Sequence, residues 1–285
     1  MKKIMIMILA GLVMSTAAFS EGLFVRLGGG VTSLTGGDYN TIIQGRNDLY
    51  NNFPLLTVSS QLEKLSLGAI MSGEFIYCPS DYFGVGLGID YLQGTNDSTL
   101  NATGTGLTLS NGMTTLFRSI CLGLSLHGFV PITETIVIRA SAGPCFCFGS
   151  FKIDEATTYS TIGLDETLFF DSKSTTALGV QGSLGLELAL SDVVFLGIEA
   201  KGRLLQYKKV EGSWDLIGST STGLVRDSGS GTAWYEELLP EGGTNYYPTL
   251  VYKGLEPSGP DVRNVREFVI GLSGLGIQVS LRFEL

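Results

Sequence analysis

The end of this chain alternates strictly between apolar and polar side chains, and this pattern constrains the fold more than any other. Apolar side chains occupy every second position up to the C-terminus, at Ile277, Val279, Leu281, Phe283 and Leu285. Between them lie the polar residues Gln278, Ser280, Arg282 and Glu284. Because successive side chains of a β-strand point to opposite faces, the pattern predicts a strand with one apolar and one polar face.

The first twenty residues have the features of an export signal. Lys2 and Lys3 precede an apolar stretch, and small residues then lead to a cleavage site after Ser20. The apolar stretch is too short to cross the ~30 Å of hydrocarbon in a bilayer as a helix. We therefore predict a cleaved signal peptide at residues 1–20, followed by one domain at residues 21–285.

Seven further segments show the same alternation as the C-terminal one. In the clearest of them, Phe83, Val85 and Leu87 alternate with Gly84 and Gly86. The eight predicted strands cover residues 23–32, 66–77, 83–91, 119–127, 136–143, 178–188, 196–204 and 267–285. The 39 glycines are about twice the usual ~7% of a chain of 285 residues, and they suit a crowded interior.

The connections between the predicted strands alternate in length. Three are tight turns, at residues 79–81, 131–135 and 191–192. The other four are long, at residues 33–65, 92–115, 150–175 and 207–266. Short turns at one end and long loops at the other are typical of barrels in the bacterial outer membrane. The predicted fold class is therefore all-β. We expect an eight-stranded antiparallel transmembrane up-and-down β-barrel with four long extracellular loops, which follows the cleavable signal peptide.

One residue conflicts with a regular ladder in such a barrel. Pro144 lies in the continuation of the fifth strand and has no N–H to donate. A closed barrel has no edge strand that could host a proline. We therefore expect a bulge at Pro144 or an early end of the ladder.

A glycine-rich stretch at residues 178–187, followed by Ser191 and Asp192, adds to the signal, the alternating strands and the amphipathic C-terminus. With these features the chain resembles the small outer-membrane barrels of the OmpA membrane domain, OmpW and opacity-protein type. The resemblance implies contact with outer-membrane lipid and with the assembly machinery, which reads the C-terminal strand. For an OmpW-like barrel it implies a narrow channel for, or a binder of, small and often hydrophobic solutes.

The polar faces of the predicted strands carry nine charged residues: Arg26, Glu74, Asp90, Arg139, Glu187, Glu199, Lys201, Arg203 and Arg282. They can form a charged constriction that selects solutes. Alternatively, they can form a plug of opposite charges that neutralise one another. The interior of an eight-stranded barrel is just wide enough for side chains to fill, which favours the plug. Four apolar residues share these faces and indicate a partly apolar interior: Phe24, Ile70, Ile76 and Phe117.

His127 is the one histidine of the chain, and Ser125 shares its predicted face. A Ser–His hydrolase requires the two side chains within hydrogen-bond reach. Residues two apart on a strand are separated by ~6.6 Å along the backbone. We therefore interpret His127 as an interior hydrogen-bonding residue and expect no enzymatic activity, no catalytic residues and no cofactor.

The four cysteines lie in a chain that is exported to an oxidising compartment. With a turn at residues 131–135, Cys121 falls opposite Cys145 or Cys147, and a cross-strand disulfide with one of the two is a hypothesis. The alternative, which the sequence favours, is that several of the cysteines are simply small buried residues. Cys78 is expected to be unpaired. A metal site at the Cys-x-Cys pair is disfavoured because no histidine or carboxylate lies in register with it, so we expect no metal.

The last long connection is the richest in aromatic residues, which suit contact with a partner. The candidates for binding are Trp214, Trp234, Tyr235, Tyr246 and Tyr247. A nucleic-acid partner is disfavoured, since without Lys2 and Lys3 the chain has 16 basic and 27 acidic residues and a net charge of −11. The second functional hypothesis is therefore a closed barrel that acts as a surface-exposed adhesin or antigen, or as an envelope-stabilising scaffold, through its long loops.

Overall fold

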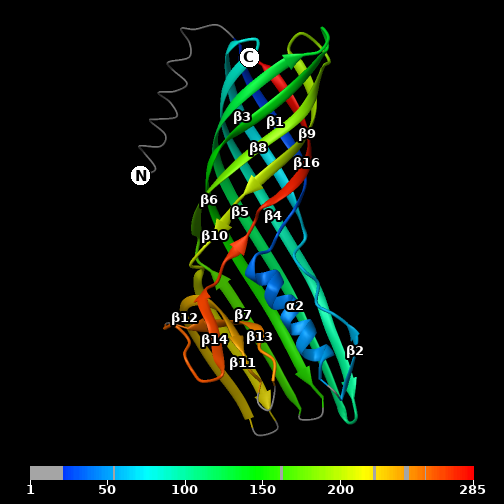
Figure 1. Cartoon of the computed structure of the whole chain (residues 1–285), viewed down its shortest axis with the longest axis vertical. Coiled ribbons are helices and arrows are strands. Elements are labelled where there is room, and N and C mark those ends of the chain that lie inside the picture. The colour runs from blue at the N-terminus through cyan, green and yellow to red at the C-terminus, as the bar shows by residue number, and fades with distance from the viewer. Residues whose placement is uncertain (1–21, 54, 161–162, 221–222, 241–243, 254) are drawn as a thin grey trace.

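Eight antiparallel strands form a closed hydrogen-bonded ring in the computed structural model of this chain (Figure 1). The structure describes residues 22–53, 55–160, 163–220, 223–240, 244–253 and 255–285, and the predicted signal peptide lies outside these ranges. The ring consists of β1 (Leu23–Ser33), β3 (Leu67–Ser80), β4 (Phe83–Gly104), β5 (Leu107–Pro131), β6 (Ile136–Tyr159), β8 (Thr175–Ala189), β9 (Val194–Leu204) and β16 (Gly274–Glu284). β16 pairs with both β9 and β1, which closes the ring.

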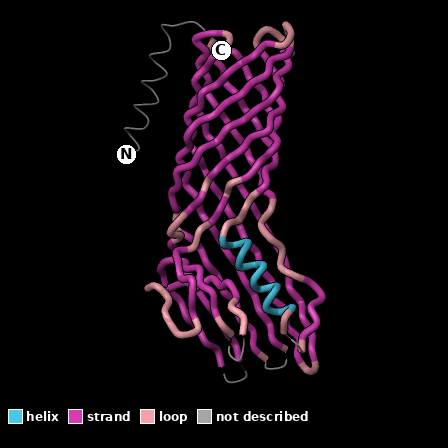
Figure 2. Tube along the Cα trace, viewed as in Figure 1, coloured by secondary structure: helices cyan, strands magenta, loops and turns pink. Residues whose placement is uncertain are grey.

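Three ring strands, β4, β5 and β6, continue far beyond the ring into a second part of the molecule (Figure 2). We call this second part the extension. It also contains α2 (Asp38–Asn51), β2 (Leu56–Ser60), β7 (Leu164–Ser172), β11 (Glu211–Thr220), β12 (Gly223–Leu238), β13 (Tyr247–Lys253) and β14 (Val262–Glu267). The ring and the extension belong to one 14-stranded antiparallel sheet.

Strand β6 shows how the ring becomes the extension. Residues 136–149 pair with β8 of the ring, whereas residues 152–159 pair with β7 of the extension. Two short strands, β10 (Gln206–Tyr207) and β15 (Ile270–Gly271), form a separate small sheet next to this junction. The extension is an open sheet with edges at β2, β13 and β14, and α2 contacts β2 and β13.

The prediction of four long loops is wrong. Residues 33–65 contain α2 and β2, and residues 92–115 are the ends of β4 and β5 with a turn at Gly106. Residues 150–175 form most of the β6–β7 hairpin, and residues 207–266 form most of β11 to β14. The predicted eighth strand at 267–285 is also shorter than expected, because β16 begins at Gly274.

The outward face of the sheet changes from apolar to polar at a single level. On β4 the odd-numbered side chains face outward throughout, but exposed Leu87 and Ile89 in the ring give way to exposed Thr99 and Thr103 in the extension. The last apolar row across three neighbouring strands is Tyr91, Ile120 and Phe148. The next row is Gln93, Arg118 and Ser150. Alternate side chains therefore still point outward beyond this level, but the outward ones become mostly polar and the inward ones mostly apolar.

Helix α2 packs its apolar stripe against the inner face of the extension. Tyr39, Ile42 and Ile43 follow helical spacing and are buried. The preceding residue Gly37 has a φ of 60°, a conformation that favours glycine. Asp38 in the first turn accepts a hydrogen bond from the N–H of Val269 at 2.9 Å, which ties the start of the helix to the junction.

The expected disruption at Pro144 takes a milder form than a bulge or an early strand end. The β5–β6 ladder omits two residue pairs there and resumes in the same register, while Pro144 stays paired with Val180 of β8. The backbone at this point is close to β5, since a Cβ on Gly143 would lie 1.8 Å from the Leu124 carbonyl oxygen. The intact pairing with β8 keeps β6 in the ring despite the missing N–H.

No helix within the described ranges is long and apolar enough to span a membrane.

Candidate functional site

All nine charged residues that the sequence placed on the polar faces are buried inside the ring. They comprise five positive and four negative side chains. Burying an unpaired charge costs several kcal/mol, so an interior of this kind requires the charges to neutralise one another. The structure shows two clusters of ion pairs that do so.

The larger cluster joins five strands around Glu199. Glu199 accepts hydrogen bonds from both Arg26 and Arg139. Arg26 also donates to Glu74 through Nε at 3.1 Å and Nη2 at 2.8 Å. Arg139 reaches Glu187 with its Nε at 3.2 Å. The cluster therefore alternates in charge from one residue to the next.

Arg282 extends this cluster toward the short turns of the ring. Its Nε donates to Glu187 at 3.0 Å. The same guanidinium lies over three aromatic rings, those of Phe195 at 4.0 Å, Phe24 at 4.3 Å and Phe129 at 5.3 Å. Such stacking stabilises a cation away from water.

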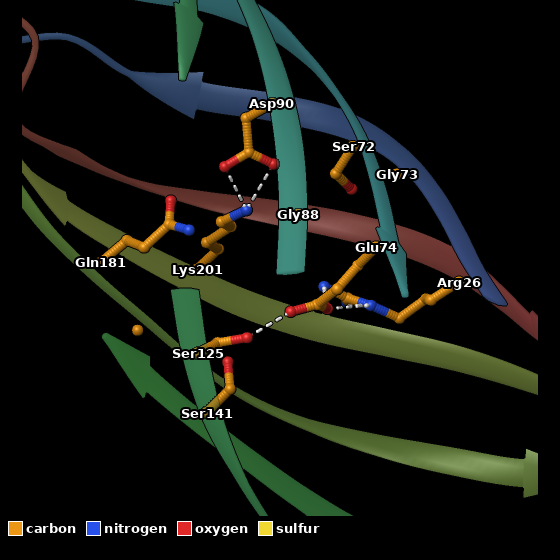
Figure 3. Close-up of a pocket in the computed structure, with 11 residues that line it drawn as sticks. Arg26, Ser72, Gly73, Glu74, Gly88, Asp90, Ser125, Ser141, Gln181 and Lys201 are labelled. Carbon is orange, nitrogen blue, oxygen red and sulfur yellow. Dashed lines mark hydrogen bonds and ion pairs between the residues drawn. The ribbon is translucent and has the colours of Figure 1, made fainter. Parts of the chain in front are cut away.

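The smaller cluster is centred on Asp90. Lys201 Nζ lies 2.7 Å from both carboxylate oxygens of Asp90, and Arg203 Nη2 lies 2.9 Å from Oδ2. Figure 3 shows the side chains of Asp90 and Lys201 pointing toward one another across the interior. One carboxylate thus holds two cations from the neighbouring inward positions of β9.

A small cavity of about 20 Å³ separates the two clusters (Figure 3). Its lining includes Arg26, Glu74, Asp90 and Lys201 together with Gln181. A cavity needs about 10 to 15 Å³ to hold one water molecule. The cavity is therefore large enough for about one water and too small for a solute.

Ser125 and His127 are closer together than backbone spacing suggested. Their side chains both turn to the interior, and Ser125 Oγ lies 2.8 Å from His127 Nε2. The same Nε2 lies 3.0 Å from Glu74 Oε1, while His127 Nδ1 has no partner among the described residues. A catalytic relay needs the acid on one ring nitrogen and the serine on the other. The arrangement instead joins His127 to the larger ion-pair cluster.

The four predicted interior apolar residues are buried and divide between the two ends of the ring. Phe24 and Ile76 pack with Cys78 and Phe129 beside the short turns. Ile70 and Phe117 belong to the large apolar core that fills the junction and the extension. The ion pairs therefore lie between two apolar layers.

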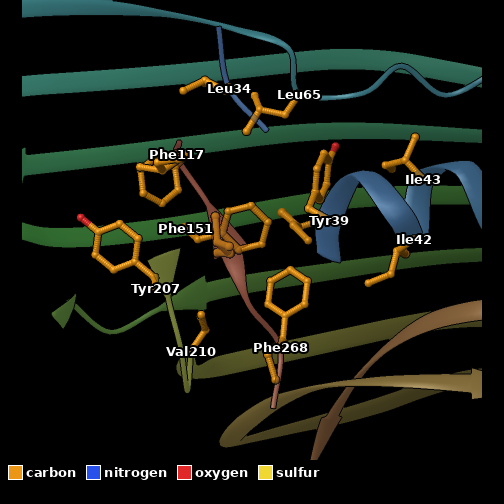
Figure 4. Packing of buried hydrophobic residues seen from close by; sticks show 14 of the residues in the cluster. Leu34, Tyr39, Ile42, Ile43, Leu65, Phe117, Phe151, Tyr207, Val210 and Phe268 are labelled. Carbon is orange, nitrogen blue, oxygen red and sulfur yellow. The ribbon is translucent and has the colours of Figure 1, made fainter. Parts of the chain in front are cut away.

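The junction is filled by aromatic side chains (Figure 4). Phe117 of β5 and Phe151 of β6 meet Tyr207 of β10 and Phe268, which precedes β15. Tyr207 also shares a hydrogen bond of 2.6 Å with Ser119. The segments that form β10 and β15 thus close the end of the ring that faces the extension.

A disulfide joins Cys121 of β5 to Cys147 of β6, which lie directly opposite each other. Of the two predicted partners for Cys121, the structure selects Cys147. Cys145 and Cys78 are free and buried. The disulfide lies at the last ring level before the faces change character, so it links two strands where the ring becomes the extension. Within the described ranges, no group of His, Cys, Asp and Glu side chains could hold a metal ion.

The five aromatic binding candidates lie on or beside strands of the extension. Trp214 on β11 stacks on Tyr252, and Trp234 on β12 donates to the Lys253 carbonyl at 3.3 Å. Tyr235 is 5% exposed and lies under the Arg266 guanidinium, so its ring offers little surface to a partner.

Tyr246 and Tyr247, at the start of β13, are half-buried and border the largest groove among the cavities described here. The groove measures about 840 Å³ and lies between the polar face of α2 and residues 244–248. The sequence suggested the aromatic residues but not the groove, because α2 was predicted as loop. Its helical signal was present in the spacing of Tyr39, Ile42 and Ile43.

The fold is distantly similar to solved structures. A crystal structure of a major outer membrane protein from Thermus thermophilus is 12% identical, with coverage of 91% of this chain and 100% of the other, and a TM-score of 0.36. The Ralstonia pickettii toluene transporter TbuX is 8% identical, with coverage of 94% and 90% and a TM-score of 0.18. No protein-family model matches the sequence, and no curated protein matches it.

Proposed function

We propose that the ring is a β-barrel in the bacterial outer membrane and that it anchors the extension at the cell surface as a binding module. Of the two functions suggested by the sequence, this is the surface scaffold rather than the narrow channel. In this proposal the lipid contacts the apolar outer face of the ring, and the assembly machinery reads β16. Ser125 and His127 have a structural role, and no reaction is assigned to the chain.

The level at which the outer face changes supports the membrane placement. On β5 the apolar outward residues run from Ile120 to Val130, and ten residues rise about 33 Å along a strand. At a tilt of about 45°, this stretch spans about 23 Å, which matches the ~25 Å apolar band of outer-membrane barrels. Beyond Arg118 the outward side chains of β4, β5 and β6 are mostly polar and the inner face is mostly apolar, as in a water-soluble sheet.

The observation that carries the choice of function is the filled interior. Paired charges occupy the middle of the ring, and apolar layers occupy both ends. Between the two charge clusters there is room for about one water molecule. A ring packed in this way favours a closed anchor over a path for solutes.

Conductance tests the closed ring. Refolded residues 21–285 in a planar bilayer should give no discrete openings, and Lys201→Glu should leave this silence unchanged. Openings whose ion preference shifts in Lys201→Glu would instead support a pore lined by the β9 charges. Lys201 is the informative position because its ammonium is held by Asp90 in the interior.

Epitope accessibility tests the orientation. An epitope inserted at the β4–β5 turn, between Thr105 and Gly106, should bind antibody on intact cells. The matched control carries the same epitope in the short turn at residues 133–135, which lies at the opposite end of the molecule (Figure 1). The control should bind only after the outer membrane is permeabilised. The reverse result would place the extension in the periplasm and contradict the proposal.

A further inference from the structure

The largest surface groove described in the extension lies between a wall on α2 and a wall at residues 244–248. One wall is a polar stripe on α2 and its C-cap, formed by Thr41, Gln44, Asp48 and Asn52 at helical spacing. The other wall is the segment at residues 244–248. A volume of about 840 Å³ lies within the ~300 to 1,000 Å³ that is typical of ligand sites.

The floor of the groove is a tight contact between α2 and the opposite wall. Gly45 faces Pro248, and a Cβ at Gly45 would lie only 2.5 Å from Pro248 Cδ. A side chain at this position would push the two walls apart. Glycine therefore sets the width of the groove.

Contacts on the buried side of α2 and within the opposite wall hold the groove in place. Asn47 donates to the Leu62 carbonyl at 2.8 Å and accepts from the Leu62 N–H at 3.0 Å, which fixes α2 from its buried side. Arg263 stacks on Tyr246 at 3.8 Å and donates to Glu237 at 2.8 Å. The groove is thus formed before any ligand arrives, which lowers the entropy lost on binding.

Some of the polar side chains that face the groove already have partners, since Lys64 donates to Gln44 and Arg263 donates to Glu237, but three in the described ranges do not. Within the described part of the chain, the side chains of Asp48, Asn52 and Asn245 make no hydrogen bonds. A carboxylate and two amides provide both acceptors and donors, and each amide can do both. Exposed groups of this kind are ready to exchange water for ligand hydroxyls.

Tyr247 and Tyr246 add aromatic surface to the same groove. A sugar ring has an apolar C–H face, which stacks on an aromatic ring, and hydroxyls at its edge, which bond to amides and carboxylates. Tyrosine combines an apolar body with a polar tip and suits such a ligand. The polar α2 stripe disfavours an apolar solute, and the net charge of −9 disfavours a nucleic acid.

We propose that this groove binds an oligosaccharide, with Asp48 and Asn52 bonding its hydroxyls and Tyr247 stacking on a ring. The inference rests on the proposed function, since it names the class of ligand that the surface module binds. It adds two residues of α2 and its C-cap that the sequence did not single out, Asp48 and Asn52, to the aromatic candidate Tyr247.

Binding of defined sugars tests the site. Full-length protein in detergent is titrated calorimetrically with neutral and acidic oligosaccharides of about two to six units. We expect at least one to bind, and Asp48→Ala/Asn52→Ala to weaken its Kd by about tenfold or more, as expected for the loss of about 1.4 kcal/mol of hydrogen bonding. Tyr247→Ala should weaken it similarly.

The matched control is Lys152→Ala/Asp171→Ala, which removes an exposed ion pair on β6 and β7 away from the groove. The control should bind as the wild type does. Absence of binding across the panel, or equal binding by the wild type and the groove variants, would overturn the inference. The proposed function fails separately, by conductance or by epitope accessibility, so the two failures are distinguishable.

Discussion

Individual charges in the ring interior depend on partners that are distant in the sequence. Glu199 lies between two arginines, one of them 173 positions away along the chain. Each guanidinium has only carboxylates to neutralise it in the interior. Removing Glu199 therefore takes one carboxylate partner from each of two arginines, and leaves Arg26 with Glu74 and Arg139 with Glu187.

Glu199→Leu should lower the free energy of unfolding by about 3 to 5 kcal/mol, because Arg26 and Arg139 both lose their shared carboxylate. Urea unfolding in lipid vesicles, followed by circular dichroism, measures the change. Glu284→Leu, at the end of β16, is the control and should shift stability by at most about 0.5 kcal/mol. Equal effects of the two variants would show that the cluster contributes nothing to stability.

Two adjacent glutamates on β12 have opposite electrostatic environments. Burial raises the pKa of Glu236, whose Oε2 has no hydrogen-bond partner in the described structure. Burial also raises the pKa of Glu237, but hydrogen bonds with Asn264 and Arg263 outweigh it and leave that pKa lowered. The two residues therefore affect stability with opposite dependence on pH.

Glu236→Gln should raise the Tm at pH 7. The folded protein holds the Glu236 proton more tightly than the unfolded chain, so its contribution is full below the ordinary pKa of ~4.3 and is lost as pH rises through the raised value. The advantage of the variant should fade near pH 4. Glu237→Gln should instead lower the Tm at pH 7, since a lowered pKa stabilises above ~4.3. Thermal melts at pH 7 and pH 4 measure both changes in Tm. A change of the same sign in both variants at pH 7 would contradict the opposite pKa shifts of Glu236 and Glu237.

At the scale of elements, β5 and β6 are the strands that connect the two parts of the molecule. Both pass from the ring into the extension, and β6 changes its partner from β8 to β7 on the way. The Cys121–Cys147 disulfide joins them at this level. A cross-link here restricts the unfolded chain and holds the two strands in register.

Cys121→Ser/Cys147→Ser should lower the free energy of unfolding by roughly 3 to 4 kcal/mol, given the sequence separation of 26 between the two cysteines. Urea unfolding under non-reducing conditions measures this loss. Cys145→Ala retains the disulfide and serves as the control, with a smaller effect expected. Mass spectrometry of the non-reduced wild type that finds Cys121 unpaired would remove the basis of the prediction.

Over the whole molecule, the two faces of one continuous sheet exchange their chemistry at one level. Ring strands present apolar residues outward and paired charges inward. The extension presents mostly polar residues outward on β4, β5 and β6 and an apolar core inward, covered by α2. One sheet thus suits lipid at one end and water at the other.

A charge introduced on the outer face should therefore be costly only in the ring. Leu124→Arg, midway along the apolar band of β5, should destabilise the protein by about 2 to 4 kcal/mol in lipid vesicles. Thr114→Arg, exposed on the same face of the same strand in the extension, should change stability by at most about 0.5 kcal/mol. A similar cost at both positions in an unfolding titration would contradict the proposed membrane boundary at Arg118.

The sequence by itself determined the ring strands, their tight turns and the inward direction of all nine charges, because a period of two is a local property of the chain. The same alternation continues into the extension, where Leu100 and Ala102 point inward between polar residues, but this segment was predicted as loop. The helical spacing in α2 was visible but short. Local alternation says which face a side chain occupies, but not which neighbour it meets.

Tertiary structure alone decided those neighbours. It selected Cys147 rather than Cys145 as the partner of Cys121, because register sets which cysteine lies directly opposite. It paired Asp90 with Lys201, 111 positions along the chain. It also formed the groove, since Gly45 and Pro248 meet only when α2 packs against β13. Contacts between distant residues depend on how the closed ring brings strands together, and no local pattern contains that information.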